Sequence, residues 1–171
     1  RGELRILPNH KDDLKHKVTY RTFGLLQYHT IGRVDDTAHF EMKDPRSHDK
    51  FADAALRIKV TWSKNVNDER ECPDQILFGS GDDEYCLLIA LILHFETFLE
   101  VNPGAKYMFT KADDDEAPNR LKTNYRTVLK KAVWDKQEFK DLSEDGEEGD
   151  IGTHSKRKLP ATYAIICGML T

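Results

Sequence analysis

The chain has 171 residues, the usual length of one domain, so a single domain spanning residues 1–171 is expected. Hydrophobic residues make up 39% and charged residues 33%, which excludes collagen-like and fully disordered proteins. Acids outnumber bases by 30 to 26, giving a net charge of −4, so a globally basic nucleic-acid binder is not indicated, although a local basic face stays open.

The three cysteines, Cys72, Cys86 and Cys167, contain no CxxC pair, so neither a disulfide framework nor a zinc ribbon is supported. No metal and no other cofactor is expected. The longest apolar run, residues 85–93, is too short to span a bilayer, and no signal peptide opens the chain. We therefore expect an intracellular protein without a membrane partner, nuclear if the source is eukaryotic. The chain begins without methionine and stops just after an apolar stretch, so a fragment is expected.

The first predicted element is a helix over residues 12–31. Its apolar residues Leu14, Val18, Leu25 and Leu26 fall roughly on one face, and Gly32 is the predicted C-terminal stop.

Strands are predicted next. Residues 54–62 alternate between apolar and polar side chains, which is the pattern of a half-buried strand. After a polar turn at residues 65–68, residues 70–78 can return as a second strand, which Pro73 places at a sheet edge. Residues 38–42 are a candidate for a third, short strand.

Helices follow the strands. Asp82 and Asp83 can cap a helix that runs to about Glu100, and because it is apolar nearly all round, we predict that it is the buried central helix. Pro118 suits the first turn of another helix. The apolar stripe of that helix comprises Leu121, Tyr125, Val128, Leu129 and Ala132. Residues 161–170 are apolar and predicted helical. The order predicts an α+β domain, mostly helical, with a small antiparallel sheet of two to three strands.

Four basic positions stand out by their order and context. Arg33 follows a helix stop and precedes Asp36 by three residues, and Lys64 lies at the end of the alternating strand. His154 and Arg157, three residues apart, can project on the same side of a helical turn. Taken singly, each fits a solvated surface charge, an edge-protecting lysine or a simple basic patch.

Together these positions resemble the catalytic domain of the tyrosine recombinases, the phage integrase family. In that family an arginine follows a helix-ending glycine and precedes an acid by three positions, as Gly32, Arg33 and Asp36 do here. A β-hairpin lysine matches Lys64, and a later His-x-x-Arg motif matches His154 and Arg157. Residues 152–164, GTHSKRKLPATYA, are most similar to recombinases borne by eukaryotic transposons. The resemblance covers roughly residues 15–168.

The resemblance implies DNA strand breakage and rejoining through a phosphotyrosine intermediate, with double-stranded DNA as partner and copies assembling on it. Arg33 and Arg157 would clamp the phosphate oxygens of the transition state. Lys64 would protonate the leaving 5′ oxygen, and His154 would assist proton transfer or bind the phosphate.

The chain departs from the family pattern at its end. The nucleophilic tyrosine should lie well downstream of His-x-x-Arg, but the chain stops at Thr171, so we expect a partial catalytic domain that cannot cut DNA alone. Tyr163 lies among apolar neighbours and is interpreted as a core residue. Lys156 replaces a position that is usually apolar, and Pro160 interrupts a continuing helix unless it starts one.

A second set of bases is predicted to contact DNA outside the catalytic positions. These candidates are Arg120, Lys122, Arg126, Lys130, Lys156 and Lys158. The segment from Arg120 to Lys131 holds no acid, although a solvated helix face explains it equally well. Two other functions therefore stay open beside the recombinase: a non-catalytic DNA-binding module derived from the same fold, and a soluble helical interaction domain, which the net negative charge favours.

Overall fold

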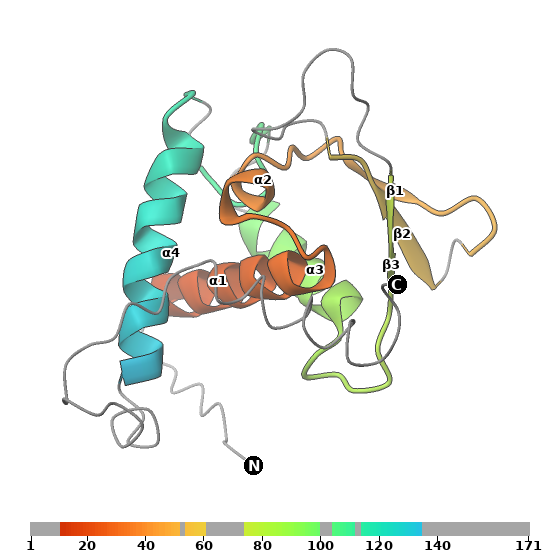
Figure 1. The fold of residues 1–171 in the computed structure, drawn as a ribbon, viewed down its shortest axis with the longest axis horizontal. Coiled ribbons are helices and arrows are strands. Elements are labelled where there is room, and N and C mark those ends of the chain that lie inside the picture. Colours follow the sequence, from red (N-terminus) through yellow and green to blue (C-terminus); the bar gives the residue numbers. More distant parts are fainter. Residues whose placement is uncertain (1–10, 52–53, 61–73, 100–103, 112–113, 135–171) are drawn as a thin grey trace, which may run out of the picture.

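The computed structural model describes residues 11–51, 54–60, 74–99, 104–111 and 114–134 (Figure 1). The elements in chain order are α1 (Lys11–His29), α2 (Val34–Ala38), β1 (Pro45–Ser47), β2 (Ala55–Ile58), β3 (Gln75–Phe78), α3 (Leu87–Leu99) and α4 (Ala117–Trp134). The predicted α+β class, helical with a small antiparallel sheet, is confirmed.

The sheet has three strands in the order β1-β2-β3, and both pairings are antiparallel. Within the described part of the strand predicted over residues 70–78, Gln75–Phe78 forms β3, at a sheet edge as expected, and residues 70–73 lie outside the described residues. The strand predicted over residues 38–42 is wrong, because Ala38 ends α2 and Glu41 forms an isolated bridge with Tyr107. The third strand is β1, which is too short and polar to show an alternating pattern.

The core is built around α1. Phe23 and Leu26 of this helix are fully buried, and the ring of Phe23 meets Phe109 and Tyr125 edge-on at centroid distances of 5.3 and 4.6 Å. Helix α1 packs against α3, α2 packs against α4, and α4 crosses α1 (Figure 1). The sheet contributes Ile58 and Leu77 to the same core cluster.

Helix α3 differs from its prediction in both its start and its burial. It begins after Cys86, whose carbonyl accepts the Ala90 N–H at 3.1 Å, so Asp82 and Asp83 do not cap it. It is also not the buried central helix: Ile92 is 61% and Leu93 46% exposed, while the side facing α1 is buried. A helix that is apolar all round carries no sequence signal for which side is covered.

Helix α4 follows its prediction more closely. Pro118 is its second residue, where a missing N–H costs nothing. Leu121 and Tyr125 are buried, and Leu129 packs partly against the core. The outer members of the predicted stripe, Val128 and Ala132, are exposed.

Candidate nucleic-acid interface

The end of α1 places Arg33. The N–H of Ile31 donates to the Tyr28 carbonyl at 3.2 Å, and the N–H of Gly32 donates to the Gln27 carbonyl at 3.1 Å. This pair of bonds is the Schellman motif, in which one residue adopts the left-handed conformation. That residue is Ile31, with φ of 50°, whereas Gly32, the predicted C-terminal stop of the helix, is the next residue of the motif.

Gly32 is needed because two threonine side chains lie too close to its Cα to leave room for a Cβ. A Cβ at this position would lie 2.7 Å from Thr30 Oγ1 and 3.2 Å from Thr37 Oγ1. Both hydroxyls make hydrogen bonds: Thr30 donates to the Leu26 carbonyl at 2.7 Å, and Thr37 donates to the Arg33 carbonyl at 3.0 Å. The absence of a side chain at Gly32 lets these two helix-end bonds form side by side.

The backbone of Arg33 is held as the residue before α2. Its N–H donates to the Asp36 carboxylate at 3.4 Å, and its carbonyl accepts the Thr37 hydroxyl and the Thr37 N–H. Asp36 thus caps the first turn of α2, where an acid also interacts favourably with the helix dipole. The acid three residues after the arginine therefore positions the arginine backbone.

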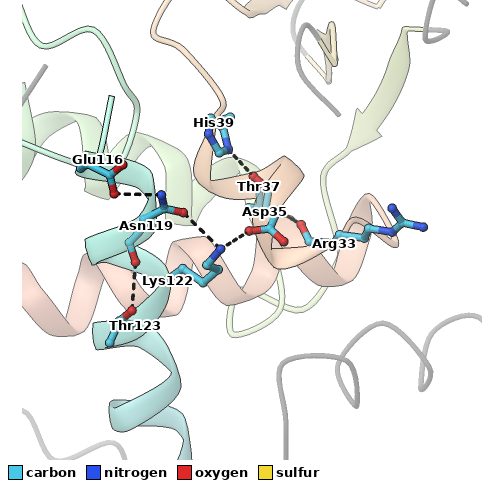
Figure 2. Close-up of polar contacts among 8 residues, drawn as sticks. All are labelled: Arg33, Asp35, Thr37, His39, Glu116, Asn119, Lys122 and Thr123. Carbon is cyan, nitrogen blue, oxygen red and sulfur yellow. Dashed lines mark hydrogen bonds and ion pairs between the residues drawn. The ribbon is translucent and has the colours of Figure 1, made fainter. Parts of the chain in front are cut away.

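The Arg33 side chain is half-buried and extends away from the polar side chains of α2 and α4. Figure 2 shows its guanidinium pointing away from Asp35 and from Lys122.

Lys122 joins α4 to α2. Its Nζ lies 2.5 Å from Asp35 Oδ1 and 3.2 Å from Asn119 Oδ1, and the Lys122 and Asp35 side chains are 21% and 32% exposed (Figure 2). Asn119 is in turn fixed by Glu116, which accepts its amide at 3.0 Å. The predicted DNA-binding lysine is therefore already paired with a carboxylate and bridges residues 87 apart in sequence.

The other described bases of α4 are more accessible. Arg120 is paired with Asp114 at 2.6 Å, and this pair, exposed on both sides, raises the pKa of Arg120 and lowers the pKa of Asp114. Arg126 and Lys130 are exposed. Because Lys122, Arg126 and Lys130 are spaced four residues apart, they follow one line along the helix.

The remaining predicted site residues lie outside the described residues. They are Lys64, His154, Lys156, Arg157 and Lys158, together with the core assignment of Tyr163. The convergence of Arg33, Lys64, His154 and Arg157 on one site therefore stays a prediction.

Sequence reasoning missed a pocket of about 230 Å³ that is lined by α1, the end of α3, residues 109–111 and α4. Its apolar lining includes Phe98, Phe109 and Leu121, and its polar lining includes His16, Thr19, Thr110, Lys111, Arg120 and Asn124. Its residues come from distant segments of the chain, so no local motif could have indicated it.

A buried histidine supports the pocket wall. The His94 ring contacts the Phe98 and Phe109 rings at centroid distances of 5.0 and 4.9 Å. Its Nε2 lies 2.6 Å from the Met108 carbonyl, which can only accept, so Nε2 carries the proton and Nδ1 accepts from the Thr19 hydroxyl at 3.4 Å. Burial lowers the pKa of His94, which keeps it neutral. His94 thus acts as a structural link between α1, α3 and the segment carrying Met108.

Comparisons with protein-family models, curated proteins and solved structures found no match. Among the residues that the structure describes, no group of three or more histidine, cysteine or acidic side chains is placed to hold a metal ion. Within those same ranges, no helix combines the length and apolarity needed to cross a membrane.

Proposed function

We propose that the chain is a DNA-binding catalytic core fragment of a tyrosine-type site-specific recombinase, in which Arg33 binds the phosphate at the cleavage position. The observation that carries this proposal is the setting of Arg33. Its backbone is fixed between two helices by Asp36 and Thr37, and its guanidinium extends away from the Asp35–Lys122 pair. An arginine held this way can present its planar donors to a phosphate.

The neighbouring helix supports the same proposal. Helix α4 contains five bases and no acid, and it packs against α2, which Arg33 precedes. Lysine and arginine side chains along a helix supply the sequence-independent part of DNA affinity by neutralising phosphates. A fixed arginine beside a basic helix is an arrangement that suits a duplex backbone.

Under the proposal, a tyrosine hydroxyl attacks the phosphorus as the bond to the 5′ oxygen breaks, and three further residues of this sequence assist that step. Arg157 would join Arg33 in stabilising the negative charge that develops on the phosphate. Lys64 would donate a proton to the leaving 5′ oxygen, and His154 would assist proton transfer. These roles follow from the order of the residues in sequence and from the chemistry of phosphoryl transfer.

Titration of a labelled duplex by fluorescence anisotropy at several salt concentrations tests the proposal. Arg33→Ala and Arg126→Ala should each weaken binding, and removing one phosphate-binding base should reduce the slope of log K against log salt by about 0.9. Lys43→Ala is the matched control, because Lys43 is an exposed base outside α2 and α4 that pairs with Glu41 at 2.6 Å. Equal affinities and slopes for Arg33→Ala and Lys43→Ala would contradict the proposal.

A second candidate, a helical interaction domain, is favoured by one observation. The outer side of α3 exposes Ile89, Ile92 and Leu93, and large apolar side chains rarely gather so closely on a free surface. Sedimentation of the wild type and Ile92→Glu distinguishes the candidates. A self-associating wild type that becomes monomeric in Ile92→Glu, without any duplex binding, would favour the interaction domain.

A further inference from the structure

We propose that the solvent-facing side of the β1-β2-β3 sheet binds single-stranded nucleic acid by stacking unpaired bases on Phe51 and Phe78. This surface, called here the sheet platform, consists of Arg46, His48, Phe51, Arg57, Ile76 and Phe78. It goes beyond the proposed function, because it lies on different elements from Arg33 and α4 and takes a different form of nucleic acid.

The register of the strands puts the strand residues of the sheet platform on one face. Arg46 pairs with Arg57 and Arg57 pairs with Ile76, and directly opposed residues of antiparallel strands share a face. Their neighbours along the strands, Ile58 and Leu77, point the other way into the core. The sheet platform is therefore the side opposite the core.

Aromatic rings are exposed on this side. Phe78 is 53% and Phe51 52% exposed, and their ring centroids are 6.2 Å apart at an interplanar angle of 62°. His48 extends the group, with its ring centroid 5.3 Å from that of Phe51. Exposed aromatic rings of this kind are the groups on which unpaired bases stack in single-strand binding proteins.

Backbone hydrogen bonds hold Phe51 next to His48 and to the start of β2. The Phe51 N–H donates to the His48 carbonyl at 3.2 Å, and the Phe51 carbonyl accepts the N–H groups of Ala54 and Ala55 at 3.0 and 2.8 Å. The His48 ring is itself fixed, because Nδ1 accepts the Lys50 N–H at 3.2 Å. Since the rings are already in place, binding requires little additional ordering. Figure 1 shows the loop after β1 projecting from the sheet on the side away from the helices.

The charged side chains on and beside the sheet platform favour an anionic occupant. Arg57 is balanced by Asp49 at 3.6 Å and Asp74 at 3.3 Å. Arg46, Lys50 and Lys59 are further exposed bases on or beside β1 and β2, so this region is locally basic although the whole chain is acidic. Basic side chains next to exposed aromatic rings match a ligand that offers both phosphate groups and the faces of aromatic nucleobases.

Single strands satisfy this combination better than duplexes. In a duplex the base faces are covered by their neighbours, so the rings of Phe51 and Phe78 would gain nothing from stacking. An unpaired segment exposes both its bases and its backbone, and stacking on them tolerates any sequence.

Fluorescence anisotropy with a labelled oligothymidine of about 15 nucleotides tests the proposal, because that length covers the usual site size of a single-strand binding domain. The Phe51→Leu/Phe78→Leu double variant keeps apolar side chains but removes the rings, and should bind at least about tenfold more weakly. Phe51→Tyr/Phe78→Tyr keeps the rings and should bind like the wild type. Tyr85→Leu is the matched control, because Tyr85 is 60% exposed but lies outside the sheet.

A second variant tests the charge separately. Arg46→Ala removes one basic side chain that would bind a phosphate, so the slope of log K against log salt for oligothymidine should fall in magnitude by about 0.7. Circular dichroism confirms that each variant is folded. Phe51→Leu/Phe78→Leu should leave binding of the labelled duplex unchanged, because paired bases do not stack on these rings, and this separates the proposal from the proposed function.

Three results would overturn the proposal. They are failure of the folded wild type to bind oligothymidine at low salt, equal binding by the Leu and Tyr double variants, and an equal loss of affinity in Tyr85→Leu. If the wild type self-associates without binding oligothymidine, and the Leu double variant is monomeric, the sheet platform is a protein interface instead.

Discussion

Replacing Gly32 with alanine should destabilise the junction between α1 and α2. The new Cβ would lie 2.7 Å from Thr30 Oγ1, and that hydroxyl cannot move aside without leaving its 2.7 Å bond to the Leu26 carbonyl. Breaking such a bond from a buried hydroxyl costs about 1–3 kcal/mol. The smaller entropy of the unfolded chain returns about 0.4–1 kcal/mol for a glycine-to-alanine change. The expected net loss in the free energy of unfolding is about 1–2 kcal/mol.

Urea unfolding followed by circular dichroism measures this loss. With a slope of about 1–3 kcal/mol per molar urea, the midpoint should fall by roughly 0.5–1 M while the slope stays constant. Gly81→Ala is the matched control, because a Cβ at Gly81 has no neighbour within 4 Å and should leave the midpoint unchanged or slightly higher. In a Thr30→Ala background, Gly32→Ala should cost at least about 1 kcal/mol less, since the clashing oxygen is gone. An undiminished cost in that background would refute the steric explanation.

Three further outcomes are expected. Ile31→Gly should raise the free energy of unfolding by up to about 1 kcal/mol, because the left-handed conformation is costly for a β-branched residue; a lower urea midpoint would show that the missing Ile31 packing outweighs this strain. Burial lowers the pKa of His94 in the folded state, so below its unfolded pKa of about 6.5 the unfolded state binds more protons, and the free energy of unfolding falls as the pH falls. In His94→Gln the urea midpoint should depend less on pH in that range. An unchanged pH profile would contradict the conclusion that His94 is buried and neutral. Asp35→Asn should release Lys122 and increase duplex affinity, with the salt slope steepening by about 0.9; an unchanged affinity and slope would show that Lys122 faces away from the DNA.

Local sequence signals predicted the elements whose start or pattern depends on neighbouring residues alone. Pro118 marked the start of α4, and the alternation around β2 identified a strand whose Ile58 is buried. The five-residue helix α2 was missed because it is too short to show a period and is held by bonds at Arg33 and Asp36.

Long-range contacts explain the remaining differences. The left-handed residue at the end of α1 is Ile31, although the adjacent glycine carries the sequence signal, because the hydrogen bonds of the junction fix the register of the turn. At the candidate site, the setting of Arg33 after a helix end was predictable. The pairing of Lys122 with Asp35 was not, because it joins residues 87 apart and depends on how α4 packs against α2.

The acids beside α4 determine which of its bases a phosphate can reach. The Arg120–Asp114 pair is exposed on both sides, and such pairs contribute little, so a DNA phosphate can replace Asp114 at small cost. The Lys122–Asp35 pair is more buried and fixes α4 against α2, so a phosphate could take Lys122 only by loosening the packing between the two helices. Under the proposed function, Lys122 in the wild type is therefore a positioning residue, and the exposed bases such as Arg126 bind the phosphates. The affinity of this chain for duplex DNA should therefore depend less on the total number of basic side chains in α4 than on which of them are held by partly buried ion pairs with acids.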